Sequence, residues 1–262
     1  MTSTTAATYT EGPSALLVTA IHAGKAMRPS LKALCHLNEA QRLREEDPFT
    51  DRWTTISDNS IIGLRSRFEV DLNRPRTKAV YRTPADCWGL DVWNGILPTV
   101  EVERSLATYD EFYETTGAMV ERLLSMHPRV MIYDLHSYNH QRQAPGVDDD
   151  PALNPEINLG TANIDRDVWG EALDVLTSAL MKGPDDRKND VRENVKFKGG
   201  HFGFWLNERF GARVCPVAIE FKKVFMDEWT GAPDEAAIER IHALLTATIA
   251  PVMRATNAVE HA

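Results

Sequence analysis

The chain has 262 residues, 43% of them hydrophobic, which is enough for one sizeable α/β domain with its own core. Lys and Arg number 29 against 38 Asp and Glu, and the net charge of -9 argues against a general nucleic-acid-binding or anionic-membrane surface, because both need net basic faces. The three cysteines lie far apart, which argues against a disulfide framework or a cysteine zinc site. A small-molecule substrate, even an anionic one held by a few local arginines, remains the expectation.

The amino-terminal residues are polar and lack the basic and apolar regions of a signal peptide. No run of residues approaches the roughly 18 apolar positions of a membrane span. We therefore expect a disordered tail over residues 1–12, a single domain over residues 13–262 and a cytoplasmic location.

The first expected strand covers residues 15–21 and ends at His22, two positions before Gly24. A glycine there lets the backbone turn tightly and leaves room beside the imidazole. Helical sequence follows over residues 29–37 and 38–44, before a group of acidic side chains. This group consists of Glu45, Glu46, Asp47 and Asp51. A solvated helix end is one interpretation of these carboxylates, and a metal ligand is the other.

Residues 66–72 alternate polar and apolar side chains, which predicts a half-buried or edge strand. Pro75 keeps Arg74 extended and ends this strand. Arg67 lies seven positions before Arg74, so a bent or bulged strand could aim both guanidinium groups at one pocket. Ordinary surface arginines are the alternative. The irregular segment 82–98, which contains tryptophans and prolines, is expected to form one wall of a cleft.

A long amphipathic helix is expected over residues 109–127, where apolar side chains recur at helical spacing. The strand predicted next, over residues 129–135, is a short apolar run that leads into His136 and Ser137. In α/β sheets the chemistry lies just beyond the carboxyl ends of strands, so these side chains are candidates for a site. A structural histidine at the edge of the core is the alternative. The polar loop 140–155 is placed over or beside this site.

Three more helices are expected, over residues 165–182, 202–210 and 233–250. Gly199 and Gly200 precede the second of these, and backbone N–H groups exposed at such a position commonly hold an anion or a substrate carbonyl. The last expected strand covers residues 214–221 and carries Glu220 near its end. A carboxylate in such an apolar strand is costly unless it is paired or used.

The polar side chains at these strand ends suggest one kind of chemistry. Two histidines and a carboxylate form a ligand set of hydrolytic zinc, which keeps its fourth position for water. A further carboxylate that does not bind the metal would serve as general base. Arginines would bind a substrate carboxylate and stabilise the oxyanion. A Ser137 nucleophile is disfavoured, because the chain has no G-x-S-x-G motif.

Several short motifs follow one another along residues 15–230. They are His22-Ala23-Gly24, Val70-Asp71-Leu72-Asn73-Arg74-Pro75, Asp134-Leu135-His136-Ser137, Phe197-Lys198-Gly199-Gly200, and Glu220 followed by Phe225-Met226-Asp227-Glu228. In combination they resemble the N-formylglutamate amidohydrolases, a family similar in fold to the zinc carboxypeptidases. The resemblance implies an α/β fold in which a mixed, mostly parallel, eight-stranded central sheet carries helices on both faces.

The resemblance also implies one Zn²⁺ ion per chain and a role for each matching residue. The implied roles are zinc ligand for His22 and His136, general base for Glu220, polarisation of the scissile carbonyl for Arg67, and binding of the substrate carboxylate for Asn73 and Arg74.

The acidic zinc ligand follows the first histidine in this family, and we assign it to Glu46. The alternatives are Glu45, Asp47 and Asp51. Ser137 and Gly200 are expected to contact the substrate, and Asp134 to support the site. His201 is also expected to contact the substrate, and it stands where the family usually has tyrosine, so the acyl group or the amino acid could differ.

Together, these features predict a zinc-dependent hydrolase of a linear amide, N-formyl-L-glutamate or a related N-acyl amino acid. One alternative is a carboxypeptidase-like peptidase or cell-wall amidase, with the same metal centre in a wider cleft. Another is a non-catalytic binding protein on the same fold, without stoichiometric metal. The sequence predicts no particular oligomeric state.

Overall fold

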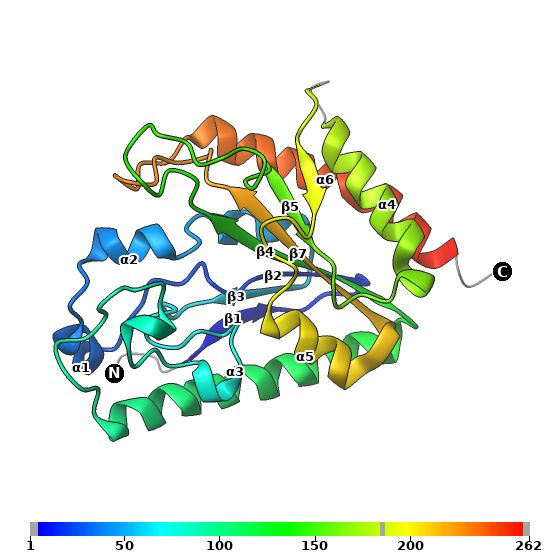
Figure 1. Cartoon of the computed structure of the whole chain (residues 1–262). Helices are drawn as coiled ribbons and strands as arrows, with labels where there is room; N and C mark the ends of the chain where they lie inside the picture. The colour runs from blue at the N-terminus through cyan, green and yellow to red at the C-terminus, as the bar shows by residue number, and fades with distance from the viewer. Residues whose placement is uncertain (1–4, 184–186, 259–262) are drawn as a thin grey trace.

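The computed structural model describes residues 5–183 and 187–258 (Figure 1). Its centre is a seven-stranded sheet with the order β1-β3-β2-β4-β7-β5-β6. The strands are β1 (Ala7–Thr10), β2 (Leu16–Ala20), β3 (Ser60–Gly63), β4 (Val130–Tyr138), β5 (Ile157–Gly160), β6 (Val191–Glu193) and β7 (Val214–Lys222). Only the β1–β3 and β5–β7 pairs are antiparallel. The predicted mixed, mostly parallel α/β sheet is therefore confirmed, with seven strands in the described residues against the eight implied by the resemblance.

Helices cover both faces of the sheet. They are α1 (Pro29–Leu34), α2 (Glu39–Glu45), α3 (Thr99–Met126), α4 (Arg166–Lys182), α5 (His201–Phe210) and α6 (Glu235–Ala258), with short 3₁₀ helices at Thr50–Ile56, Arg76–Lys78, Pro84–Asp86 and Gly211–Arg213. Helices α3 and α5 lie on one face, and α4 and α6 on the other (Figure 1). This arrangement buries the apolar side chains of β4 and β7 from both sides.

The central strand β4 carries the polar side chains that matter for the site. Its Val130 and Ile132 pack in the core on the α3 and α5 face, whereas Met131 and Tyr133 pack on the α4 and α6 face. Because successive side chains of a strand point to opposite faces, Asp134 and His136 share the α3 and α5 face. All nine residues of this strand are buried.

The amino-terminal tail is a correction. Residues 7–10, within the tail predicted to be disordered, form β1 and pair with β3 at an edge of the sheet. Threonine and tyrosine suit a half-buried edge strand, so their polarity concealed it. Residues 1–4 of the predicted tail lie outside the described residues.

The strand predicted over residues 66–72 is wrong. The Ser66 carbonyl accepts hydrogen bonds from the backbone N–H groups of Glu69 (2.8 Å) and Val70 (3.2 Å), which makes this segment a turn. The polar–apolar alternation arises because apolar side chains such as Phe68 and Val70 enter the core while the polar ones pair with other polar groups, as Arg67 does with Asp71. The nearby sheet strand is β3, which the sequence pattern did not indicate.

Helix α6 resembles a membrane-crossing helix in one respect. Over Glu235–Thr256 it is long and apolar enough to cross a membrane, by length and composition only. Its Ile238, Ile241 and Leu245 belong to the core cluster beneath the sheet, and core helices commonly meet the same criterion.

Helix α3 is longer than predicted. The helix that was predicted from residue 109 begins at Thr99, directly after Pro98.

Candidate metal centre and active site

Three buried side chains converge beyond the carboxyl ends of the central strands. His22 follows β2, Asp47 follows α2 and His136 lies on β4, and one ligand atom of each lies within 4.8 Å of the others. Asp47 Oδ2 lies 3.0 Å from His136 Nδ1 and 3.6 Å from His22 Nδ1. The Asp47 backbone N–H donates to the His22 carbonyl (3.0 Å), which fixes the loop after α2 against the end of β2.

A carboxylate holds the opposite side of each imidazole ring. His22 Nε2 lies 2.8 Å from Asp71 Oδ1, and His136 Nε2 lies 2.9 Å from Asp134 Oδ2. Metal-binding histidines usually donate their second N–H to such a partner, which fixes the tautomer and the ring orientation. Both Nδ1 atoms are thereby free to face Asp47. The donor set of two imidazoles and one carboxylate therefore fits a divalent metal ion such as zinc.

The Asp47 carboxyl is held in the form that binds a metal. Burial would raise its pKa, but the adjacent imidazoles of His136 and His22 bring the pKa well below its usual value. The carboxylate is therefore ionised at neutral pH, as metal binding requires.

Glu46, predicted to be the acidic ligand, lies outside this group. Its backbone is extended (φ −79°, ψ 172°), so its side chain and that of Asp47 point in opposite directions. The Glu46 carboxylate accepts a hydrogen bond from Ser66 and lines a separate pocket that contains Lys25 and Arg42. Asp47, one of the alternatives that the sequence left open, takes its place in the group.

Glu220 lies on the neighbouring strand beside the candidate metal-binding group, which consists of His22, Asp47 and His136. It is the register partner of His136 in the parallel β4–β7 pair and lines the same pocket. Burial raises the pKa of Glu220 to about 8, although the His136 imidazole opposes this. No side chain or backbone group in the described residues hydrogen-bonds to its carboxyl group. A buried carboxyl group with a pKa near neutral is suited to general acid–base catalysis.

One cavity of about 210 Å³ brings most of the predicted site residues together. These residues are His22, Arg67, Asn73, Arg74, His136, Ser137, Gly200 and Glu220. The cavity also contains cationic side chains that no sequence motif indicated. Arg142, from the loop predicted to lie over the site, pairs in bidentate fashion with Glu45 at 3.0 and 3.1 Å. Lys223 is buried and donates to the Arg44 and Glu46 carbonyls, each at 2.7 Å.

Asn73 and Gly200 are packed directly against each other. The Asn73 side-chain oxygen accepts a hydrogen bond from the Phe202 backbone N–H at 3.0 Å. A Cβ atom at position 200 would lie 2.1 Å from this oxygen, so only glycine allows Asn73 this close to the start of α5. The glycine before α5 thus positions a predicted substrate-binding amide.

The comparisons with known proteins agree with this geometry. A family model described as N-formylglutamate amidohydrolase matches residues 14–226, most of the chain. The chain belongs to the N-formylglutamate amidohydrolase family. No curated protein matches the chain.

Two solved structures share its fold. The N-formylglutamate amidohydrolase from Ralstonia eutropha JMP134 superposes with a TM-score of 0.72 at 18% identity, over 95% of this chain and 98% of that chain. A gene product from Agrobacterium tumefaciens superposes with a TM-score of 0.64 at 17% identity, over 98% and 97%. A putative carboxypeptidase A from Shewanella denitrificans OS-217 reaches a TM-score of only 0.36 at 17% identity, over 92% and 56%, which is too low to support a conclusion.

His201 does not line the cavity in this member of the N-formylglutamate amidohydrolase family. It is the first residue of α5, and its ring lies 5.9 Å from that of Tyr113 on α3. The side chain therefore lies against α3, and its contact with the substrate stays a prediction.

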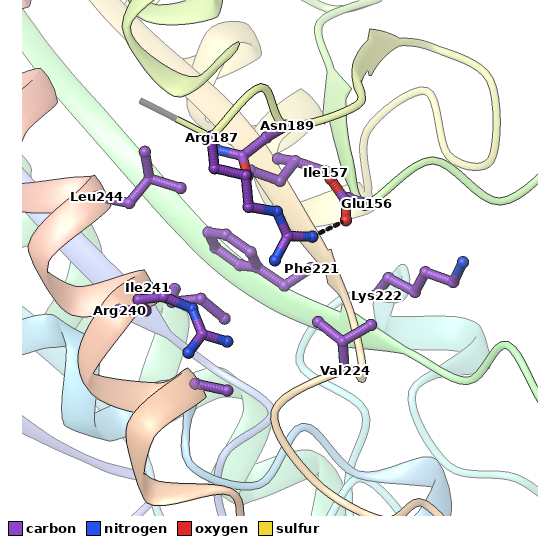
Figure 2. A pocket seen from close by; sticks show the side chains of 11 residues that line it. Glu156, Ile157, Arg187, Asn189, Phe221, Lys222, Val224, Arg240, Ile241 and Leu244 are labelled. Atoms are coloured by element: carbon purple, nitrogen blue, oxygen red, sulfur yellow. Dashed lines mark hydrogen bonds and ion pairs between the residues drawn. The ribbon is translucent and has the colours of Figure 1, made fainter. Parts of the chain in front are cut away.

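A second pocket lies on the other face of β7. Phe221 follows Glu220, so its ring points away from the metal-binding group and forms the floor shown in Figure 2. The walls come from Ile157, Ile241 and Leu244, and Arg187 at the rim pairs with a neighbouring glutamate. The metal-binding group lies outside this pocket, which therefore does not compete as the candidate active site.

The hydrogen bond between Asp134 and His136 gives a first testable prediction. Asp134→Asn keeps the shape of the side chain and its place beside Thr19, but the amide supports the imidazole less well than a carboxylate does. We expect zinc affinity to fall by about 10–100-fold. Competition with a chromogenic chelator measures this affinity. Asp174→Asn, an exposed change on α4, is the control, and equal affinity for both variants would contradict the assignment.

Proposed function

We propose that the chain is a zinc-dependent amidohydrolase that cleaves a linear amide, N-formyl-L-glutamate or a related N-acyl amino acid. One observation carries the proposal: the group of His22, Asp47 and His136 shares a buried pocket with the carboxyl group of Glu220. When bound to the three side chains, zinc would supply Lewis-acid polarisation and lower the pKa of the attacking water.

The other residues of the pocket would carry the remaining steps. Glu220 takes a proton from the water as the water oxygen bonds to the amide carbon. It then delivers this proton to the amide nitrogen as the C–N bond breaks. The products are formate, or another acid, and the free amino acid. Arg67 donates hydrogen bonds to the carbonyl oxygen as negative charge develops there. Asn73 and Arg74 bind the substrate carboxylate.

The geometry around Arg67 supports this role. Its guanidinium donates to Asp71 (2.9 Å), to the Tyr81 hydroxyl (3.3 Å) and to the Glu45 carbonyl (3.2 Å). These three contacts fix its orientation before substrate arrives, and a preorganised donor stabilises developing charge without reorganisation during the reaction.

Metal removal tests the proposed function directly. Purified protein should contain about one zinc ion per chain and release formate from N-formyl-L-glutamate. Dialysis against a chelator should abolish formate release, and added zinc should restore it. Elemental analysis and a formate assay give the two readouts. Full activity of the metal-free protein would sink the proposal, and amino-acid release from small peptides without formate release would favour a peptidase.

A further inference from the structure

Trp88 has an unusual conformation at the mouth of the cavity. Its φ angle of 49° lies in the left-handed region, as does that of Gly89 at 87°. A bulky aromatic residue occupies this region only at a cost in energy, and such residues are concentrated at functional sites. Its side chain is 49% exposed, so burial in the core does not offset the cost.

The indole of Trp88 is shared by the two arginines of the site. The Arg67 guanidinium carbon lies 4.8 Å from the ring centroid and that of Arg74 lies 5.9 Å from it. The Tyr81 ring and the indole pack in an edge-to-face arrangement, with 6.0 Å between centroids. Arg67 and Arg74, seven positions apart in the chain, are thus gathered around one aromatic side chain.

The two arginines differ in what else restrains them. Hydrogen bonds fix Arg67, whereas within the described residues the Arg74 side chain forms only a long ion pair with Asp71, with 3.7 Å between Nε and Oδ2. Aromatic neighbours are its other restraint, because the Arg74 guanidinium carbon also lies 5.5 Å from the Tyr81 ring centroid. Its orientation therefore depends on Trp88 and Tyr81.

This kind of restraint has a chemical advantage. A guanidinium that stacks on an aromatic face keeps its in-plane N–H donors free, because the attraction is to the ring and consumes no hydrogen bond. Free in-plane donors are what a carboxylate binds in bidentate fashion. Trp88 can therefore hold Arg74 in place without using the donors that a substrate carboxylate needs.

We propose that Trp88 is a positioning residue that orients Arg74 for a carboxylate ligand and so sets the preference of the site for carboxylate-bearing amides. The inference rests on the proposed function, in which Arg74 binds the substrate carboxylate.

Steady-state kinetics of the zinc-loaded, full-length protein tests this role. For N-formyl-L-glutamate, Trp88→Ala should raise KM by about two- to fivefold, the loss expected for a cation–π contact at an exposed site, while kcat should stay within about twofold of wild type. Trp88→Phe, which keeps an aromatic face, should recover much of the loss. Phe204→Ala, an equally exposed aromatic change on α5, is the control for surface effects. Zinc content and the thermal midpoint should not change.

A double-mutant cycle separates positioning from general damage. If Trp88 acts through Arg74, Trp88→Ala should add little to KM in an Arg74→Ala background. Full additivity, an unchanged KM, or a fall in kcat at constant KM would each overturn the inference.

Glutarate, a dicarboxylate with no amide to cleave, makes the inference independent of turnover. Calorimetric titration should show weaker binding to Trp88→Ala than to wild type, and no such difference in the Arg74→Ala background. If glutarate binding follows this pattern but the wild-type protein releases no formate, the proposed function alone is refuted. Formate release together with glutarate binding that is identical in Trp88→Ala and wild type would refute this inference alone. Wild-type protein that neither binds glutarate nor releases formate would overturn both.

Discussion

Replacing Glu220 with glutamine should lower kcat by about 10²–10⁴-fold, the range expected when a general base is removed. The change keeps the size and polarity of a buried side chain on β7, but an amide cannot take a proton from water. Formate release under saturating substrate measures kcat, and elemental analysis should show the same zinc content as wild type.

The matched control is a carboxylate near β7 on the opposite face of the sheet. Glu156 lies in the second pocket, so Glu156→Gln should leave kcat within about twofold of wild type, as is usual for surface changes away from a site. A near-normal kcat for Glu220→Gln would remove Glu220 from its role, and loss of zinc would mean that Glu220 binds the metal.

Asp47→Asn should lower zinc affinity by more than about 100-fold, because removing a ligand costs more than removing a supporting partner of a ligand. The neighbouring change Glu46→Gln should leave both zinc content and formate release close to wild type. Glu46 points away from the two histidines and its glutamine replacement can still accept the Ser66 hydrogen bond.

This pair of variants discriminates between adjacent carboxylates of similar burial. Chelator competition measures the affinity of each variant, and far-ultraviolet circular dichroism checks that both fold. Zinc loss from Glu46→Gln together with retention by Asp47→Asn would reverse the assignment and restore the ligand expected from sequence.

The side chains at the sheet could be predicted because parallel strands impose simple rules. His22, His136 and Glu220 each follow a short apolar run. Such a run predicts a buried strand, so the residue is expected near the carboxyl end of that strand. Parallel neighbours then bring such residues together, as the β4–β7 register does for His136 and Glu220. The position of the cavity follows from the same rule, whereas the mixed sheet was implied by the family resemblance.

The loops could not be predicted to the same precision, for identifiable reasons. The choice between Glu46 and Asp47 depends on the extended backbone conformation of Glu46, directly after α2. No periodicity in the sequence predicts the backbone angles of a single loop residue. The turn at Ser66 mimics a strand pattern, because its apolar side chains enter the core while its polar side chains form hydrogen bonds and ion pairs elsewhere. Lys223 lines the cavity and donates hydrogen bonds to carbonyl groups far away in the chain. The residues next to Lys223 in the sequence do not predict these contacts.

The nine-residue pairing of β4 with β7 has a consequence for how substrate range can change. It sets the separation of His136 and Glu220 by the fixed spacing of adjacent strands, whereas Arg74 and Trp88 lie on loops outside the sheet. Mutations that reshape the loops need not disturb the distance between base and metal ligand. Libraries confined to residues 82–98 and to positions 73 and 74, with Arg67 and Asp71 kept, should therefore yield catalysts with new acyl or amino-acid preferences more often than libraries that vary the strands.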